Sequence, residues 1–120
     1  MDKAQVWHAG EDVAAEHLAG LGWRIVERNW RCRAGELDII AIEPGPEPVV
    51  VFCEVKTRRG TAFGQPVEAI TRAKLAKLRE LSLLWLRAAG HTGANLRIDA
   101  IGVLLSQHGP ALVDHRRGIC

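Results

Sequence analysis

The feature that most constrains the fold is a pair of apolar segments separated by a stretch that excludes regular structure. Residues 35–42 (GELDIIAI) and 49–57 (VVVFCEVKT) are rich in apolar and β-branched side chains, which favour strands. Three prolines and a glycine occupy the EPGPEP segment between them and force a turn. The sequence therefore predicts a β-hairpin.

Further helices and strands are expected on either side of this hairpin. Apolar residues recur at helical spacing from about residue 3 to 21, and Gly22 follows as a stop. The other expected elements are a strand over 23–30, a helix from about 71 to 90, a buried strand over 95–105 and a short edge strand over 111–115. A strand, a long helix and a strand in that order imply a right-handed parallel crossover. The predicted fold is an α/β sandwich around a mixed sheet, in the order αβββαββ.

Length and composition limit the class of protein. With 120 residues, of which 48% are hydrophobic, one domain spanning 1–120 can bury a sufficient core. Three cysteines without a C-x-x-C pair favour a reducing compartment over a disulfide framework. No segment resembles a secretion signal or is long enough to span a bilayer, so we expect a soluble, cytoplasmic protein.

The charge is small in total but unevenly distributed. The formal net charge is +2, yet residues 56–79 hold seven of the sixteen Lys and Arg and a single acid, Glu68. A second basic cluster comprises Arg24, Arg28, Arg31 and Arg33. Such local density is compatible with phosphate contacts, whereas charge runs are more often solvated faces, and charge alone leaves both interpretations open.

The second strand of the hairpin carries ionisable residues on an otherwise apolar face. Because side chains alternate along a strand, Glu54 and Lys56 project from the same face as Val50 and Phe52. Asp38 lies on the neighbouring strand, close enough for the side chains to meet in a suitable register. The sequence does not define that register, so the meeting of Asp38 with Glu54 is a hypothesis.

Two carboxylates at this place would require a cation. Within about 4 Å their repulsion is on the order of 4 kcal/mol at an effective dielectric constant of 20, and a divalent ion would offset it. Oxygen ligands, with the carbonyl of Val55 as an extra one, suit Mg²⁺ or Mn²⁺. Lys56 would then position the attacking water in phosphodiester hydrolysis. The alternative is a solvated strand face with a cross-strand salt bridge, which the apolar neighbours disfavour.

Two helical residues depart from a simple amphipathic pattern. Glu11 lies at the edge of the apolar stripe of the first helix and is the acid there that should face inward. Lys74 falls within the buried stripe of the second helix, so it either reaches an anion or extends to solvent from the first turn.

Nucleic-acid contacts are expected from residues near these acids. Arg58 and Arg59, in a predicted loop after Lys56, are placed to hold a phosphate backbone. Trp30, flanked by arginines that include Arg31 and Arg33, either stacks on an unpaired base or packs in the core. The five histidines share no metal-ligand spacing and are expected to be structural or exposed.

Taken together, several motifs resemble those of one known family. The chain reads His8-Ala9-Gly10-Glu11-Asp12-Val13-Ala14, then Leu18, Gly22 and Arg28-Asn29-Trp30-Arg31, GELDIIA at 35–41, VFCEVKTR at 51–58, and Phe63-Gly64 with Pro66 before Lys74. Over about residues 6–105 it resembles the YraN-type family of uncharacterised bacterial proteins. That family is assigned to the PD-(D/E)XK nuclease superfamily, which includes restriction endonucleases and archaeal Holliday junction resolvases. The combination of GELD with EVKTR is specific, whereas the tail over 106–120 lies outside the resemblance.

The resemblance implies a restriction-endonuclease-like three-layer sandwich and a set of site residues. The superfamily's metal-binding acids fall on Asp38 and Glu54, its catalytic lysine on Lys56, and the resolvase-like glutamate of the first helix on Glu11. Lys74 falls on the basic position of the following helix. No proline precedes Asp38, which follows Leu37, and this is a departure from the superfamily pattern.

These observations favour a Mg²⁺- or Mn²⁺-dependent endonuclease acting on DNA, with branched or structured DNA as one substrate class. The alternative is a non-catalytic nucleic-acid-binding or partner-binding module that retains the fold, and RNA as the substrate is a third, weaker hypothesis. Dimerisation, as in the resolvase relatives, is compatible with the resemblance, although the sequence defines no self-complementary surface. No membrane partner is expected.

Overall fold

The computed structural model describes residues 2–60 and 70–119 and contains the seven predicted elements in the predicted order. Their bounds are α1 Lys3–Gly20, β1 Arg24–Cys32, β2 Gly35–Glu43, β3 Val49–Arg59, α2 Arg72–Ala88, β4 Asn95–Leu105 and β5 Leu112–Arg116. Phe63, Gly64 and Pro66, which are part of the family resemblance, lie outside the described residues.

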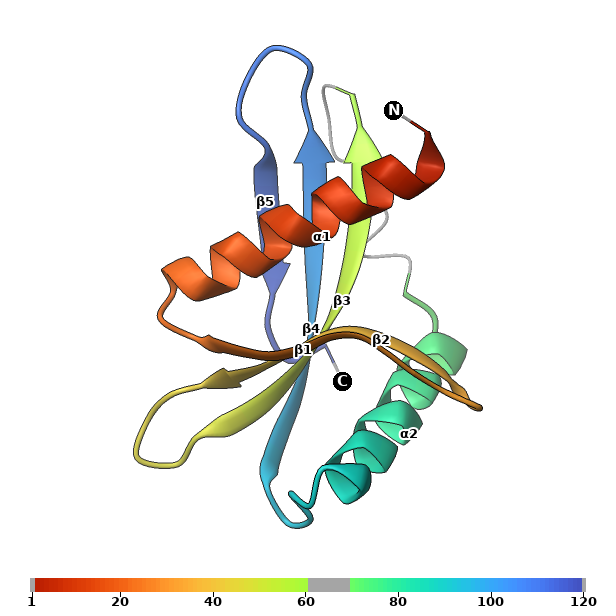
Figure 1. Ribbon diagram of the computed structural model, residues 1–120, viewed down its shortest axis with the longest axis vertical. Coiled ribbons are helices and arrows are strands. Elements are labelled where there is room, and N and C mark those ends of the chain that lie inside the picture. The colour runs from red at the N-terminus through yellow and green to blue at the C-terminus, as the bar shows by residue number, and fades with distance from the viewer. Residues whose placement is uncertain (1, 61–69, 120) are drawn as a thin grey trace.

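One five-stranded sheet forms the middle layer, in the strand order β1-β2-β3-β4-β5. Neighbouring strands are antiparallel except β3 and β4, which are parallel and are connected through α2. The predicted crossover and the mixed sheet are therefore confirmed. Figure 1 shows how strongly the sheet twists, because the β1–β2 ribbon runs across the direction of β3, β4 and β5.

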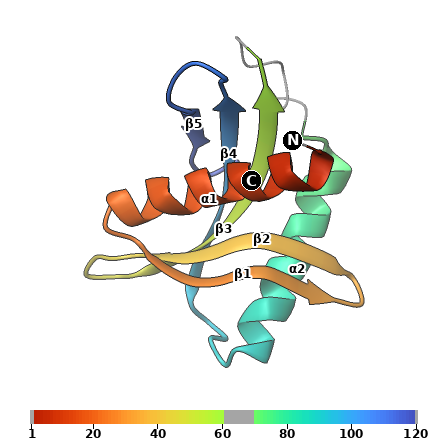
Figure 2. The ribbon, with the colours of Figure 1, turned by 45° about the horizontal axis from the view of Figure 1, so that its top comes forward.

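The two helices cover opposite faces of the sheet, which gives three layers (Figure 2). On one face Ala14 and Leu18 of α1 pack on a cluster that includes Ile39 and Val51. On the other face Leu78 and Trp85 of α2 pack on a second cluster that includes Ile40, Phe52 and Ile98. The central strands bury both faces, which explains their nearly continuous apolar sequences.

Local signals set the ends of the helices. Asp2 caps α1 in a capping box with Gln5. Gly22, the predicted stop, has φ +87° and directly follows the C-cap residue Leu21. Thr71 caps α2 by accepting a hydrogen bond from the Lys74 N–H at 3.1 Å. This cap places Lys74 in the first turn of α2.

One prediction about the end of β3 is wrong. Arg58 and Arg59 are not in a loop but are the last two residues of the strand. The parallel pairing with β4 continues through Arg58↔Leu104 and Arg59↔Leu105, and this pairing keeps the backbone extended beyond the apolar part of the sequence. Both side chains are exposed.

Candidate active site

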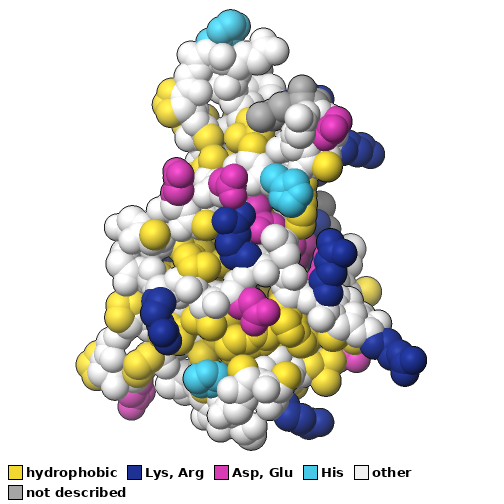
Figure 3. All heavy atoms as spheres, viewed as in Figure 1, with side chains coloured by type: hydrophobic (Ala, Val, Ile, Leu, Met, Phe, Trp, Pro, Cys, Tyr) yellow, Lys and Arg dark blue, Asp and Glu magenta, His cyan; other side chains and the backbone are white. Residues whose placement is uncertain are grey.

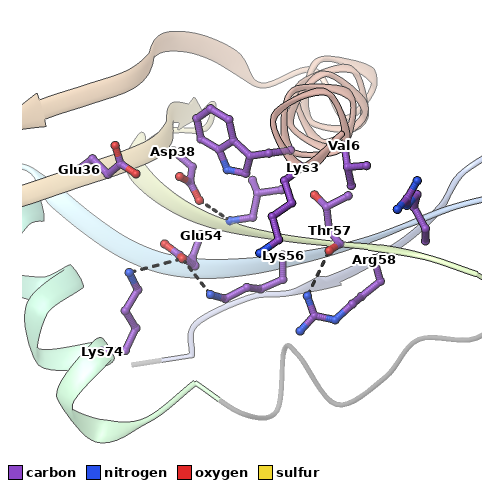
Figure 4. A pocket seen from close by; sticks show the side chains of 12 residues that line it. Lys3, Val6, Glu36, Asp38, Glu54, Lys56, Thr57, Arg58 and Lys74 are labelled. Carbon is purple, nitrogen blue, oxygen red and sulfur yellow. Dashed lines mark hydrogen bonds and ion pairs between the residues drawn. The ribbon is translucent and has the colours of Figure 1, made fainter. Parts of the chain in front are cut away.

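The site forms where β2 and β3 stop pairing. The last paired residues toward the site are Ile39 and Cys53, and the same register continued by one residue sets Asp38 opposite Glu54. In place of a further backbone partner, the Val55 N–H donates a hydrogen bond of 2.8 Å to Oδ2 of Asp38 (Figure 4). The strands thus separate at the two acids, which are only 8% and 7% exposed.

The buried position of Asp38 disfavours the ionised form of its carboxyl group. Burial raises its pKa, the charge of Glu54 raises it further, and the Val55 N–H opposes the shift, so that the pKa lies at about 7. Smaller contributions from Glu11 and Glu36 also raise the pKa. Near neutral pH the Asp38 carboxyl group is therefore only partly ionised.

Two lysines approach Glu54 from different elements. The Nζ atoms of Lys56, on β3, and Lys74, on α2, lie 3.4 Å and 3.6 Å from the same Oε1 atom of Glu54. Figure 4 shows both side chains converging on this carboxylate. The position of Lys74 in the apolar stripe is therefore matched by an anion, although its side chain remains 40% exposed.

These residues line a cavity of about 550 Å³ that is open on one side. Its lining consists of Lys3, Val6, Trp7, Glu36, Asp38, Glu54, Val55, Lys56, Thr57, Arg58, Arg59 and Lys74. Five of these residues are basic and three are acidic, so the cavity favours an anionic ligand even though it contains the carboxylate pair. On the face drawn in Figure 3, by contrast, acidic and basic side chains are interspersed.

Glu11 is fully buried, as predicted, but it lies behind the cavity and does not line it. Its Oε1 atom accepts hydrogen bonds from Nε of Arg28 at 2.9 Å and from the side-chain amide of Asn29 at 3.0 Å. Within residues 2–60 and 70–119, its Oε2 atom has no hydrogen-bond partner. In the sequence Asn29 is recognisable only as part of the Arg28-Asn29-Trp30-Arg31 motif, and no local pattern predicts its contact with Glu11.

The donor set fits a hard divalent cation. Two carboxylates and the carbonyl of Val55 leave most of an octahedral shell to water and substrate, which is how Mg²⁺ is usually held. The described part of the chain contains no group of three or more His, Cys, Asp or Glu side chains that could hold a metal ion.

The remaining predicted contact residues lie around the site rather than in it. Arg31 forms an ion pair of 3.1 Å with Glu36, which does line the cavity, and Arg33 is exposed. Trp30 packs against the apolar cluster under α2. None of these three residues lines the cavity.

The structure adds cavity residues that the sequence analysis did not select, among them Lys3, Trp7 and Thr57. Lys3 and Trp7 lie four residues apart on α1, a spacing that puts two side chains on one helical face. Trp7 lies outside the apolar stripe of α1, and a large aromatic residue off the buried face was the sequence signal that could have identified it. Their position over the end of β3 depends on how α1 crosses the sheet, which helical periodicity does not show.

No helix among the described residues is both long and apolar enough to cross a membrane.

Comparison with known protein families gives a match over most of the chain. The model of the uncharacterised protein family UPF0102 matches residues 10–103.

Curated relatives carry the same family name. A UPF0102 protein of Clavibacter michiganensis subsp. michiganensis is 46% identical over 111 residues, which cover 92% of each chain. A relative from Mycolicibacterium smegmatis is 46% identical over 119 residues, or 99% of this chain and 95% of its own length. One from Streptomyces griseus subsp. griseus is 46% identical over 111 residues, or 92% and 91% of the two chains.

Proposed function

The chain belongs to the uncharacterised protein family UPF0102, and from its site we propose that it is a divalent-metal-dependent nuclease that hydrolyses phosphodiester bonds in DNA. The observation that carries the proposal is the pairing of two buried carboxylates, Asp38 and Glu54, at a break in the β2–β3 ladder within a cavity rich in cations. The resemblance of the GELD and EVKTR motifs to those of PD-(D/E)XK nucleases supports it.

Asp38, Glu54 and the Val55 carbonyl are the groups that would hold the ion. A bound Mg²⁺ or Mn²⁺ would supply a Lewis acid for the scissile phosphate and a reason for two carboxylates to remain ionised together. In the described chain that balancing charge comes from Lys56 and Lys74, both near Glu54. The proposed ion would therefore share the Glu54 carboxylate with two lysine side chains that already contact it.

Lys56 is the residue assigned to the water. Its Nζ atom projects into the cavity beside Glu54, where an ammonium group can hold a water oxygen and donate to a phosphate oxygen. In hydrolysis the water oxygen bonds to phosphorus, the phosphorus–oxygen ester bond breaks, and the leaving oxygen takes up a proton. Arg58 and Arg59 line the same cavity and are assigned to the phosphates that flank the bond.

Glu11 is assigned an indirect role. It lies behind Asp38 and contributes to the raised pKa of that carboxyl group. Arg28 and Asn29 hold its Oε1 atom, so the proposed role of Glu11 is electrostatic rather than direct contact with the ion.

The test is cleavage of labelled single-stranded, duplex and branched DNA in Mg²⁺ or Mn²⁺, with EDTA as the blank. We expect Asp38→Asn, Glu54→Gln and Lys56→Ala each to lower the cleavage rate by about 100-fold or more. Glu80→Gln and Lys77→Ala are matched controls, since this exposed ion pair of α2 does not line the cavity. Cleavage that survives the first three substitutions would identify a contaminating nuclease and defeat the proposal.

Calorimetric titration with Mn²⁺ tests the metal site without a substrate. Wild-type protein and Glu80→Gln should bind the ion, whereas Asp38→Ala should not. Salt-sensitive DNA binding that EDTA and Lys56→Ala leave unchanged, together with no Mn²⁺ binding and no cleavage, would instead identify a non-catalytic binding module.

A further inference from the structure

The cavity has an apolar wall that metal-assisted hydrolysis does not explain. Val6 and Trp7 of α1 face the same space as the carboxylate pair and the lysines. Phosphates, metal ions and water make no use of an indole surface. The wall therefore indicates a part of the ligand that is flat and apolar.

Trp7 does not serve the core. Trp23 and Trp85 are 6% and 3% exposed, and Trp30 packs against the cluster under α2. Trp7 belongs to neither apolar cluster and remains partly exposed. Its ring centroid lies 4.8 Å from that of the exposed His8. An aromatic side chain that remains partly exposed at the wall of a charged cavity can contact a ligand.

The groups around Trp7 suit the rest of a nucleotide. Lys3, four residues before it on α1, and Arg58, on the end of β3, are exposed cations that line the same cavity. The Arg58 Nη1 atom donates to the Thr57 carbonyl at 3.2 Å, and this contact holds the guanidinium beside the cavity (Figure 4). A base against the indole would leave its phosphates among these cations and next to the carboxylates.

We infer that Trp7 and Val6 form a subsite for an unstacked nucleobase adjacent to the scissile phosphate, a proposal that rests on the proposed nuclease function. Within a continuous duplex both faces of each base are covered by neighbouring bases, so an indole gains a partner only where a nucleotide is unpaired or flipped out. The substrate class is therefore DNA with an unpaired nucleotide at the cleavage position, as in single strands, flaps or frayed ends.

Binding in EDTA separates this subsite from catalysis, because cleavage is then suppressed. The probes are a single-stranded oligothymidylate that carries one 2-aminopurine, and a blunt duplex of equal length. We expect Trp7→Ala to weaken single-strand binding by about 10-fold, to leave duplex binding within twofold of wild type, and to abolish quenching of the 2-aminopurine. Trp7→Phe should retain most of both signals, since a phenyl ring also stacks.

His8→Ala is the matched control, because it removes the adjacent exposed ring on the same helix and should behave as wild type. Equal losses for single strands and duplex in Trp7→Ala, or an unchanged single-strand affinity, would overturn the subsite. If Trp7→Ala does not fold, Trp7→Leu keeps the proposal testable, because it retains an apolar side chain without an aromatic ring and should show the same selective loss. Single-strand binding that depends on Trp7, without any Mg²⁺-dependent cleavage, would support the subsite and refute the nuclease. Mg²⁺-dependent cleavage that Trp7→Ala leaves unchanged would support the nuclease and refute the subsite.

Discussion

Asn29 has an unusual backbone for a residue in the middle of a strand. Its φ is +54°, and it is the only non-glycine residue with positive φ in the described chain. It follows a bulge in the β1–β2 pairing between Ile25 and Glu27, and its side-chain amide reaches the buried Glu11. Asparagine tolerates the left-handed region better than most residues, but the conformation still costs free energy. The left-handed residue is thus the one whose amide holds the buried Glu11 carboxylate.

Substitutions at Asn29 can separate the backbone strain from the hydrogen bond. Asn29→Gly removes only the bond to Glu11, whereas Asn29→Ala also forces a Cβ-bearing residue without a compensating amide into the left-handed region. We expect Ala to lower the free energy of unfolding by about 1 kcal/mol more than Gly, the reverse of their usual order in a strand. Urea denaturation measures both values.

Asn95 at the start of β4 provides the comparison, because it is exposed and does not have a positive φ. There Asn95→Ala should be at least as stable as Asn95→Gly. The same order at both positions would contradict the left-handed conformation of Asn29 in solution.

Helix α1 reaches the site because it crosses the end of β3 at very short range. A Cβ at Gly10 would collide with the Thr57 side chain, including its Oγ1 atom. Gly10 therefore sets how closely α1 approaches the strand that carries Glu54 and Lys56. The approach brings Lys3 and Trp7 over the cavity.

Gly10→Ala should push α1 away from β3. We expect a loss of about 1–3 kcal/mol in the free energy of unfolding, because a packed contact cannot absorb the added methyl group. The cavity should also widen, with weaker binding of Mn²⁺ or DNA. Thermal and urea denaturation measure the first effect, and calorimetry the second.

Gly20 supplies a control on the same helix. A Cβ added there meets nothing within 4 Å, so Gly20→Ala should leave stability unchanged or raise it through helix propensity. The double variant Gly10→Ala/Thr57→Ala should recover part of the loss, since it removes the atoms of Thr57 beyond Cβ. Equal effects of Ala at positions 10 and 20 would show that α1 does not pack on Thr57 as described.

At the scale of the whole molecule, a buried ion network joins the two ends of the chain to the sheet. Asp99 on β4 accepts hydrogen bonds from Arg97, from His115 on β5 and from the backbone of Gly118. His115 in turn contacts His17 of α1 at 3.0 Å. The network thereby ties the tail to the face that α1 covers.

The protonation of Asp99 links this network to pH. Burial alone would raise its pKa, but the hydrogen bonds from His115, Arg97 and the Gly118 N–H outweigh burial and lower the pKa from 3.8 to about 2. The pKa is depressed in the folded state, so the contribution to stability is fully present above pH 4. It is lost as the pH falls toward 2.

We therefore expect Asp99→Asn to lower the free energy of unfolding at pH 7 by about 2 kcal/mol or more, and the difference from wild type to shrink between pH 4 and pH 2. Urea denaturation at several pH values measures this. Asp114→Asn on β5 is the control, because its partner is the nearby Arg116 and its side chain is partly exposed. A difference that stays constant down to pH 2 would show that the charge of Asp99 does not stabilise the fold.

The sequence by itself determined the order of the elements and most of their bounds. Apolar alternation, the EPGPEP turn, Gly22 and the helix-capping residues are local signals, and each acts over a few residues whatever the rest of the chain does. The two-residue period of a strand placed Glu54 and Lys56 on one face, and the helical period turned Glu11 inward. Parallel pairing with β4 is not a local signal, which is why β3 extends through Arg58 and Arg59 beyond its predicted end.

Only the tertiary structure decided what those side chains meet. The register that sets Asp38 opposite Glu54, the approach of Lys74 from α2 and the close crossing of α1 over Thr57 depend on contacts between residues distant in sequence. The tail gave no pattern by which to connect it with Asp99, because a hydrogen-bond network has no period. Side-chain direction follows from local geometry, whereas distance between elements follows from packing, and a catalytic site requires both.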